Sequence, residues 1–511
     1  MNKNEVFEQR LKSLRQMEEN AALKQHSKGK LTARERITIL FDEGTFFEID
    51  AFVEPAQRAG SKKKSTFGDG VITGRGLIQG RSVFAFAQDF TVLGGSLGYA
   101  HGMKIARIQE MAIKLGAPII GLIDSGGARI QEGVNSLSAY ASIFYNNVKA
   151  SGVIPQISVI LGPAAGGAVY SPALTDFIFM TKNTSYMFLT GPDIVKEVLN
   201  EDVDMNSLGG GDVHAQKSGV AHFVYDDEEN AILYARKLLT YLPSNNFEPL
   251  PVANNVQYYE SRQEFLNKIV PDDPNRPYDM KDIINILVDR DSFFEVHERF
   301  AQNIVVGFAR LNGKTIGIVA NQPKVMAGTL DSNASIKGAR FVRFCDAYNI
   351  PLLILEDVPG FLPGTAQEHT GIIRNGAKLL YAFCEATVPK ITIITRKAYG
   401  GAYVVMSSKN IGGDFNYAWP TAEVAVMGPA GAIKIIHRKE LEAAESRAEA
   451  EKLFVEQYKN EVANPYKAEE IGLIDEVISP SRTRSVLINT FDILSNKQYV
   501  KPERKHGNIP L

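Results

Sequence analysis

The chain has 511 residues, of which 44% are hydrophobic, and a formal net charge of −2 at pH 7. This length is too great for one ordinary domain, so we expect two large domains with sizeable cores. The near-neutral balance of charge excludes the basic surface that binding to nucleic acid or to an anionic membrane requires. The two cysteines, Cys345 and Cys384, form no Cys-x-x-Cys pair, which excludes a disulfide framework and a cysteine-based zinc ribbon.

The sequence predicts no membrane or targeting segment. The longest apolar runs, such as residues 117–123, are far shorter than the ~20 residues that a membrane helix needs. The N-terminal residues include several glutamates and lack the apolar core of a secretory signal. The eight histidines are scattered and form no metal-ligand motif. We therefore expect a cytoplasmic protein with no membrane segment, no nucleic-acid partner and no metal in this chain.

The first half of the chain predicts a helical arm followed by alternating strands and helices. Residues 1–41 are charged, with apolar residues at helical spacing, and predict a solvated helical arm. Residues 70–88 alternate in polarity around a Gln-Gly pair, which predicts a β-hairpin. Residues 117–123 predict a buried strand that ends in the glycine turn Asp124-Ser-Gly-Gly127. Residues 153–170 then predict a strand, a turn and a helix.

The second half repeats this order of elements. Gly313, Pro351, Pro389 and Gly428 stand 233, 233, 234 and 237 residues after Gly80, Pro118, Pro155 and Gly191. The nearly constant offset indicates duplicated domains, which we place at residues 1–255 and 256–511, with a loop-rich joint over 242–251. Strands that alternate with helices predict an α/β fold with parallel-rich sheets in each half. Near the end of the chain, residues 438–463 predict an exposed helix.

Two glycine turns stand at equivalent places in this repeat. Gly166-Gly-Ala168 begins 11 residues after Pro155, and Gly400-Gly-Ala402 begins 11 residues after Pro389. A helix that starts at a Gly-Gly pair lets a ligand approach the backbone and presents N–H groups that lack acceptors. Since no matched acid and base side chains are evident, the pattern favours stabilisation of an enolate or other oxyanion by main-chain N–H groups, worth about 3 kcal/mol each.

Several other motifs do not fit the chemistry that they resemble. The Gly94-x-Ser96-x-Gly98 pattern is not preceded directly by a strand, as a nucleophile elbow requires. Gly313-Lys-Thr315 lies in a predicted hairpin turn, and its upstream glycine is one residue too far away for a phosphate loop. No Gly-x-Gly-x-x-Gly follows a first strand, which leaves a dinucleotide-binding fold unsupported. A serine hydrolase and a nucleotidase are therefore disfavoured.

A family resemblance runs through nearly the whole chain. The motifs that carry it are Gly29-Lys-Leu-Thr-Ala-Arg-Glu-Arg36, Asp124-Ser-Gly-Gly-Ala-Arg-Ile-Gln-Glu132, Gly166-Gly-Ala-Val-Tyr-Ser-Pro172, Asn321-Gln-Pro-Lys324, Asp357-Val-Pro-Gly-Phe-Leu-Pro-Gly364, Arg396-Lys-Ala-Tyr-Gly-Gly-Ala-Tyr403, Ala418-Trp-Pro420 and Lys505-His-Gly-Asn-Ile-Pro-Leu511. With these motifs the chain resembles the carboxyltransferase subunits of biotin-dependent acyl-CoA carboxylases, above all the propionyl-CoA carboxylase β subunits. It is almost as similar to the α subunits of methylmalonyl-CoA decarboxylases.

The resemblance implies a fold and an assembly. Each half is expected to form a crotonase-like ββα-superhelix domain. The N-terminal domain is expected to bind acyl-CoA and the C-terminal domain of a neighbouring subunit to bind biotin, within a homohexamer. The chain contains no Ala-Met-Lys-Met attachment sequence. Carboxybiotin is therefore expected on a partner, a biotin carboxyl carrier subunit associated with a biotin carboxylase.

The resemblance also implies roles for individual residues. The N–H groups of Gly166 and Gly167 would bind the thioester enolate, and those of Gly401 and Ala402 the ureido oxygen of biotin. Substrate contacts are implied at Ser125, Gly126, Gly127, Arg129, Ala165, Tyr170 and Val404, with Arg129 near the CoA phosphates. Cofactor contacts are implied at Tyr399, Gly400 and Tyr403.

The sequence leaves some alternatives open. Val404 stands where propionyl-preferring members often have Asp, and aliphatic residues occur there in acetyl-accepting carboxylases and in decarboxylases, so the acyl preference stays open. The same chain could instead serve a membrane-bound decarboxylase that drives a sodium pump. An inactive scaffold is opposed by intact glycine turns in both halves. A crotonase-type hydratase or isomerase is opposed by the lack of a Glu at these turns.

Overall fold

The computed structural model describes residues 2–55, 66–499 and 502–511, which divide into two compact units. The first unit comprises Met1–Pro249 and the second Leu250–Leu511. This boundary falls inside the loop-rich joint 242–251. Residues just after it already belong to the second unit, because the Ala253 N–H donates to the Gly313 carbonyl at 2.9 Å.

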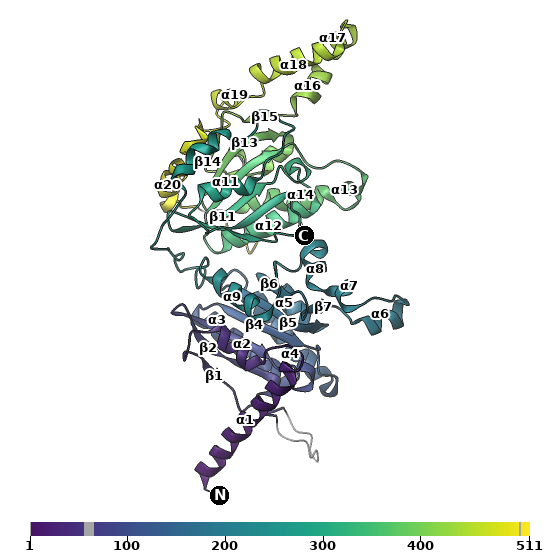
Figure 1. The fold of residues 1–511 in the computed structure, drawn as a ribbon, viewed down its shortest axis with the longest axis vertical. Helices are drawn as coiled ribbons and strands as arrows, with labels where there is room; N and C mark the ends of the chain where they lie inside the picture. Colours follow the sequence, from purple (N-terminus) through teal and green to yellow (C-terminus); the bar gives the residue numbers. More distant parts are fainter. Residues whose placement is uncertain (1, 56–65, 500–501) are drawn as a thin grey trace. The chain divides into compact units, whose positions relative to one another are not determined.

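The first unit is built on a mixed sheet that has eight strands within the described residues (Figure 1). Seven of them follow in the order β1-β2-β3-β4-β5-β6-β8, and β7 pairs with β5 beside this path. Its strands are β1 (Phe47–Ile49), β2 (Val71–Ile78), β3 (Arg81–Gln88), β4 (Ile119–Ser125), β5 (Gln156–Ala165), β6 (Phe177–Thr181), β7 (Tyr186–Phe188) and β8 (Phe223–Tyr225). Its helices are α1 (Lys3–His26), α2 (Ala33–Leu40), α3 (Tyr99–Leu115), α4 (Val134–Ala150), α5 (Gly167–Ala173), α6 (Pro192–Leu199), α7 (Met205–Gly209), α8 (Gly211–Val213) and α9 (Glu228–Leu239). The β1-β2-β3 pairs are antiparallel and the later pairs parallel.

The second unit repeats this topology, in the order β9-β10-β11-β12-β13-β14-β16. Its strands are β9 (Phe294–Val296), β10 (Ile304–Leu311), β11 (Lys314–Asn321), β12 (Leu352–Val358), β13 (Lys390–Tyr399), β14 (Phe415–Ala418), β15 (Glu423–Ala425) and β16 (Glu476–Val477). Its helices are α10 (Leu266–Ile269), α11 (Met280–Leu287), α12 (Ser332–Ala347), α13 (Thr365–His369), α14 (Ile372–Glu385), α15 (Gly400–Val405), α16 (Pro429–Ile436), α17 (Arg438–Ala443), α18 (Arg447–Glu461), α19 (Pro465–Glu470) and α20 (Thr483–Ile493). The predicted duplication and the crotonase-like α/β class are therefore confirmed.

The longest strand of each unit pairs with two different strands along its length. In the first unit β5 pairs with β6 over Ile157–Ile160 and with β7 over Pro163–Ala165. In the second unit β13 pairs in the same way with β14 and then with β15. The ends of β5 and β13 thus extend beyond the strands with which their first residues pair. Each glycine turn follows directly after such a strand end.

The predicted hairpins form as expected. At the β2–β3 turn Gln79 and Gly80 have φ of 50° and 75°, and at the β10–β11 turn Asn312 and Gly313 have φ of 52° and 79°. Two successive residues with positive φ make a turn whose twist matches that of paired antiparallel strands. The Gln-Gly and Asn-Gly pairs therefore specify the same turn in both halves.

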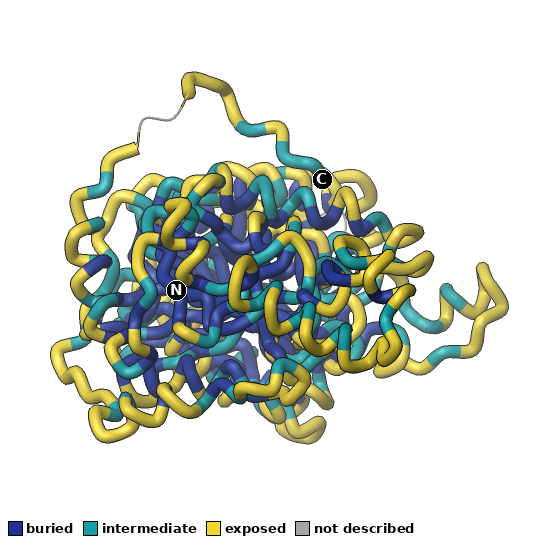
Figure 2. Tube along the Cα trace, turned by 90° about the horizontal axis from the view of Figure 1, so that it is seen from above, coloured by how far each residue is buried: buried dark blue, intermediate teal, exposed yellow. Residues whose placement is uncertain are grey.

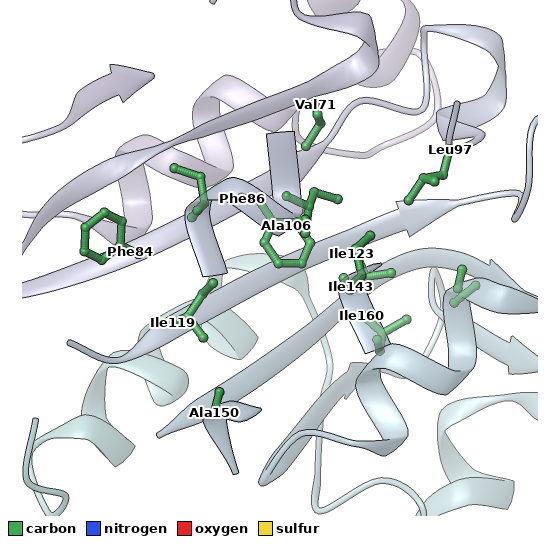
Figure 3. Close-up of a cluster of buried hydrophobic side chains, with 14 of the residues drawn as sticks. Val71, Phe84, Phe86, Leu97, Ala106, Ile119, Ile123, Ile143, Ala150 and Ile160 are labelled. Carbon is green, nitrogen blue, oxygen red and sulfur yellow. The ribbon is translucent and has the colours of Figure 1, made fainter. Parts of the chain in front are cut away.

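A buried apolar cluster of the first unit lies between the sheet and helices α3 and α4. Figure 3 shows side chains of β3, β4 and β5 directed toward those of the two helices, including Phe86, Ile123, Ile160, Ala106 and Ile143. Burial follows this layering, because buried residues gather in the interior and exposed ones in outer helices and loops (Figure 2). Alternate residues of β4 point to opposite faces of the sheet. Asp124, which follows Ile123, therefore faces α2 and α9, whereas Ile123 faces α3 and α4.

Two helical predictions need correction. Helix α1 is largely exposed, as predicted for a solvated arm, but α2 is not: its Arg36 is completely buried and pairs with Glu228 of α9 at 2.7 Å. The stretch predicted as one exposed helix forms α17 and α18, which are separated by an extended Ala444. Within residues 2–55, 66–499 and 502–511, no helix combines the length and apolar character needed to cross a bilayer.

Candidate active site

The N-terminal glycine turn joins β5 to α5 through Gly166. Gly166 has φ of 57° and ψ of −123°, a conformation that residues with a Cβ rarely adopt. Its N–H donates to the carbonyl oxygens of Phe188 and Leu189, at 3.3 and 3.1 Å, next to the β5–β7 pairing. The residues at the end of β7 therefore already use the Gly166 N–H in this structure, and a role of this group in binding the enolate stays a prediction.

The donors that this turn presents are shifted by one residue. Helix α5 begins at Gly167, and the first N–H groups of a helix have no acceptor within it. The N–H groups of Gly167 and Ala168 are thus the donors at the start of the helix, and the predicted pair of Gly166 and Gly167 stays a prediction. Ala168 was missed although the repeat could have identified it, since an offset of 234 residues aligns it with Ala402.

Tyr140 of α4 packs against the N-terminal glycine turn. A Cβ added at Gly167 would lie 3.0 Å from the Tyr140 ring, so a larger residue fits here only if the ring shifts by a few tenths of an ångström. Burial raises the pKa of Tyr140 well above its ordinary value, so its hydroxyl stays protonated. The ring also contacts Phe144, which in turn contacts the exposed Tyr170. Tyr170, a predicted substrate contact, thus lies on the outer side of α5.

The predicted glycine-rich loop after β4 lies beside this turn. A Cβ on Gly127, whose φ is 96°, would come within 2.8 Å of the Ala165 carbonyl oxygen. The Ser125 hydroxyl donates to the Gly95 carbonyl at 2.7 Å and accepts from the Gly127 N–H at 3.2 Å. Ser125 is buried and used internally, whereas Gly126 is exposed and accessible to a ligand.

Arg129 is enclosed by internal partners. One terminal nitrogen donates to Asp69 at 2.7 Å and to Glu132 at 2.8 Å, and the other donates to the Ser96 carbonyl at 2.9 Å. Its side chain is only 3% exposed. These contacts give Arg129 a structural role in the loop, and a contact with CoA phosphates stays a prediction.

The C-terminal glycine turn joins β13 to α15. Gly400 has φ of 60°, and α15 then presents the N–H groups of its first turn, among them those of Gly401 and Ala402. No atom lies within 4 Å of a Cβ built on Gly401, and this residue is exposed. Val404 is also exposed on the same helix, whereas Tyr403 is buried.

Tyr399 is held firmly where β13 ends. Its hydroxyl donates to Glu423, whose other oxygen accepts from the Lys459 ammonium at 2.6 Å. Burial and the Glu423 carboxylate together raise the pKa of Tyr399 far above its ordinary range. Tyr399 therefore acts here as a neutral hydrogen-bond donor that anchors the turn.

Each half also buries an aspartate at the end of its central parallel strand. Asp124, near the end of β4, accepts from Lys30 at 2.6 Å and from Arg36 at 3.0 Å. Asp357, in the equivalent place in β12, accepts from Arg396 of β13 at 3.0 Å and from the Lys397 N–H at 3.1 Å. Sequence reasoning gave Lys30 and Arg36 no part in the site, because a charged helical segment usually faces solvent.

The arrangement of the two turns suits two carbonyl-type ligands. Each turn presents neutral N–H donors at a helix start, which bind oxygen atoms that gain negative charge. Among the described residues no cluster of three or more His, Cys, Asp or Glu side chains could hold a metal ion.

Comparisons with known proteins agree with this geometry. The family model described as the carboxyl transferase domain matches residues 24–509. The chain is a member of the carboxyl transferase family. A propionyl-CoA carboxylase carboxyltransferase subunit of Haloferax mediterranei is 56% identical over 99% of both chains. A methylmalonyl-CoA decarboxylase subunit α of Veillonella parvula is 55% identical over 96% of this chain and 94% of its own.

A solved structure is also similar to this carboxyl transferase. It is the transcarboxylase 12S hexamer with methylmalonyl-CoA and methylmalonic acid bound. It shares 48% identity and a TM-score of 0.95, and the alignment covers 100% of this chain and 99% of the other. The fold of this chain therefore agrees with that of the transcarboxylase 12S chain over the full length of this chain.

Proposed function

We propose that this chain is the carboxyltransferase subunit of a biotin-dependent propionyl-CoA carboxylase. The observation that carries the proposal is the pair of helix starts, at Gly167 and at Gly400–Ala402, in equivalent places of the two halves. Such a pair suits a reaction in which two different carbonyl-type oxygens gain negative charge. The Haloferax mediterranei relative, named for the same activity, supports propionyl-CoA as the acyl substrate.

The first unit binds the acyl-CoA in this proposal. The N–H groups of Gly167 and Ala168 hold the thioester oxygen, and their hydrogen bonds strengthen as the α-carbon loses its proton. Each such donor contributes about 3 kcal/mol when its geometry is set before the reaction. The Tyr140 ring limits movement of the turn, because the ring lies against the position that a Cβ of residue 167 would occupy.

The second unit binds biotin. Carboxybiotin, delivered on the carrier domain of a partner, would supply the CO2 that bonds to the α-carbon, and the biotin anion left after CO2 departs would take up the α-proton. The N–H groups of Gly401 and Ala402 hold the ureido oxygen, and the anchored Tyr399 keeps the start of α15 in place. Val404 is exposed on the same helix, and in this proposal it contacts the acyl group and sets the acyl preference.

The remaining expectations form part of this proposal. The active assembly is a homohexamer, by analogy with the transcarboxylase 12S structure. Its partner is a biotin carboxyl carrier subunit that also carries, or associates with, a biotin carboxylase. The assembly operates in the cytoplasm.

Purification with the native partner tests the proposal. We expect a streptavidin probe to capture this chain together with a biotinylated subunit that contains an ATP-binding carboxylase domain. The captured complex should fix labelled bicarbonate into propionyl-CoA only when ATP is present. A complex that fixes no label into any short acyl-CoA contradicts the proposal. The matched control is the same complex with Gly401→Ala in this chain.

The decarboxylase remains a second candidate, because the Veillonella parvula subunit is nearly as similar as the carboxylase subunits. The same purification separates the two. A small biotin protein with a membrane subunit, and decarboxylation of methylmalonyl-CoA that needs no ATP, would favour this alternative.

A further inference from the structure

The second unit contains a cavity of about 360 Å³ at one end of its sheet. The cavity lies where β11 starts and just before β12 and β13 begin, and α20 and the residues after it form its other side. Much of its lining is apolar, including Leu311, Ile316, Val388, Ile488 and Phe491. Cavities of about 300 Å³ or more are typical of sites for small molecules. The glycine turn follows the opposite end of β13, so this cavity is separate from the turn.

The first unit occupies the same place with an arginine. Arg81 and Lys314 are equivalent, because each begins the second strand of its hairpin. Arg81 donates to the carbonyl oxygen of Leu239, where α9 ends, and to that of Leu242 at 2.8 Å. Lys314 instead pairs with Asp492 at 2.7 Å, and both side chains are more than half exposed. The duplicated fold therefore allows this place to be bridged by a side chain, and the second unit leaves it open.

One buried hydroxyl in the lining lacks a partner. Thr315 is only 1% exposed, and its hydroxyl makes no hydrogen bond within the described part of the chain. The equivalent hydroxyl of the first unit, that of Ser82, accepts from the Arg75 side chain at 2.9 Å. Buried hydroxyl groups are nearly always hydrogen-bonded in folded proteins. The Thr315 hydroxyl is therefore available to an oxygen atom of a ligand in the cavity.

The charged side chains of the lining favour an anion. They are Lys314, Lys497 and Asp492, so two positive groups stand against one negative group. The Lys497 ammonium donates to Asp414 at 2.7 Å and to the Val388 carbonyl at 3.1 Å. An ammonium has three N–H donors, so these two bonds leave one for a ligand. A carboxylate can accept from an ammonium and from a hydroxyl at the same time.

We propose that this cavity binds a small carboxylic acid with an apolar body, in its ionised form. Its carboxylate accepts from the Thr315 hydroxyl and from the Lys497 ammonium, and such charge-assisted hydrogen bonds are the stronger kind. Its hydrocarbon part leaves water and packs against Leu311, Ile316 and Phe491. The inference does not depend on the proposed function, because every residue that carries it lies in the second unit, away from the glycine turn.

Isothermal titration calorimetry of the full-length chain with octanoate tests this site. We expect a Kd of about 0.1 mM, as a ligand of about ten non-hydrogen atoms in a partly apolar cavity allows. Octanol has the same chain without the charge and should bind about tenfold more weakly. Octylamine carries the opposite charge and should give no heat of binding. Saturating coenzyme A should not displace octanoate, which separates this cavity from an acyl-CoA site.

Variants of the lining locate the binding. Thr315→Val removes the hydroxyl at nearly constant volume and should weaken octanoate binding about tenfold. Lys497→Met removes the ammonium and should weaken it at least as much. The matched control is Lys409→Met, which breaks a pair with Asp475 outside the cavity lining and should bind octanoate as wild type does. Thr315→Val should melt no lower than wild type, since it removes a buried hydroxyl that has no partner, so its weaker binding does not reflect unfolding.

Three results would overturn the inference. The first is no binding of octanoate by the wild-type chain at about 1 mM, tenfold above the expected Kd. The second is equal affinity for octanoate and octylamine. The third is an affinity within about twofold of wild type in both Thr315→Val and Lys497→Met, which would mean adventitious binding elsewhere. None of these results would affect the proposed function, whose test measures carboxylation and not this cavity.

Discussion

The two halves of the chain share one topology but support their glycine turns differently. In the first unit the Tyr140 ring packs against the turn and would lie 3.0 Å from a Cβ at Gly167. In the second unit the equivalent Gly401 has no atom within 4 Å of a Cβ position. The duplicated backbone thus provides N–H donors in both units. The side chains that pack against each turn decide how large a group fits beside these donors.

The buried aspartates show a similar divergence. Asp124 receives its cations from Lys30 and Arg36, which precede the sheet in the chain. Asp357 receives Arg396 from the strand beside it. The acid is retained in both halves and its partners are not. The buried aspartate therefore needs a cationic partner in both halves. The partner comes from the N-terminal segment in the first half and from the neighbouring strand in the second.

The largest expected effect concerns the buried charge network of the first unit. Asp124→Asn leaves Arg36 and Lys30 without their carboxylate and should lower the free energy of unfolding by about 3–5 kcal/mol. Urea denaturation followed by far-UV circular dichroism measures this change. Asp226→Asn, which removes an exposed partner of Lys182, is the control and should stay within about 0.5 kcal/mol. Equal losses in the two variants would contradict the comparison.

Alanine at the two turn glycines should separate stability from binding. Gly167→Ala forces a contact with Tyr140 and should cost about 1–3 kcal/mol of stability as well as activity. Gly401→Ala meets no neighbour and should stabilise its helix by up to about 1 kcal/mol, because alanine favours helix over glycine. It should still raise the KM for biotin, since the methyl group enters the ligand space. Thermal melting and steady-state kinetics of both variants provide the measurements.

The acyl preference should respond to the exposed residue of the biotin-side helix. Val404→Asp should change the ratio of propionyl-CoA to acetyl-CoA turnover about tenfold, as expected for one altered contact in a pocket. The measurement is kcat/KM for each acyl-CoA in the reconstituted complex, with Val404→Ile as the size control. An unchanged ratio would remove this residue from the specificity argument.

The smallest expected effect lies at the anchor of the C-terminal turn. Tyr399→Phe removes the hydrogen bond to Glu423 and should lower stability by about 1 kcal/mol. The equivalent residue of the first unit is Ala165, which has no hydroxyl to lose, so the turn itself should survive. A KM for biotin within about threefold of wild type, measured with free biotin, is expected. A loss of all activity would give Tyr399 a direct part in the chemistry.

The sequence by itself determined the duplication, both hairpins, the class of fold and the position of the glycine turns. These features depend on local chemistry: Gln-Gly and Asn-Gly turns, runs of β-branched residues, and glycine where φ is positive. The family resemblance added the carboxyltransferase activity, which the comparisons support. The residues of the C-terminal turn stay predictions with geometry that suits them.

Only the tertiary structure decided which groups are available at each turn. Gly166 loses its N–H to a strand that lies more than twenty residues further along the chain, and no local pattern reveals such a pairing. Arg36 appears in a charged helical segment yet is completely buried, because Glu228 and Asp124 meet it there. Long-range packing sets these pairs, since the energy of a buried polar group depends on partners that are distant in sequence.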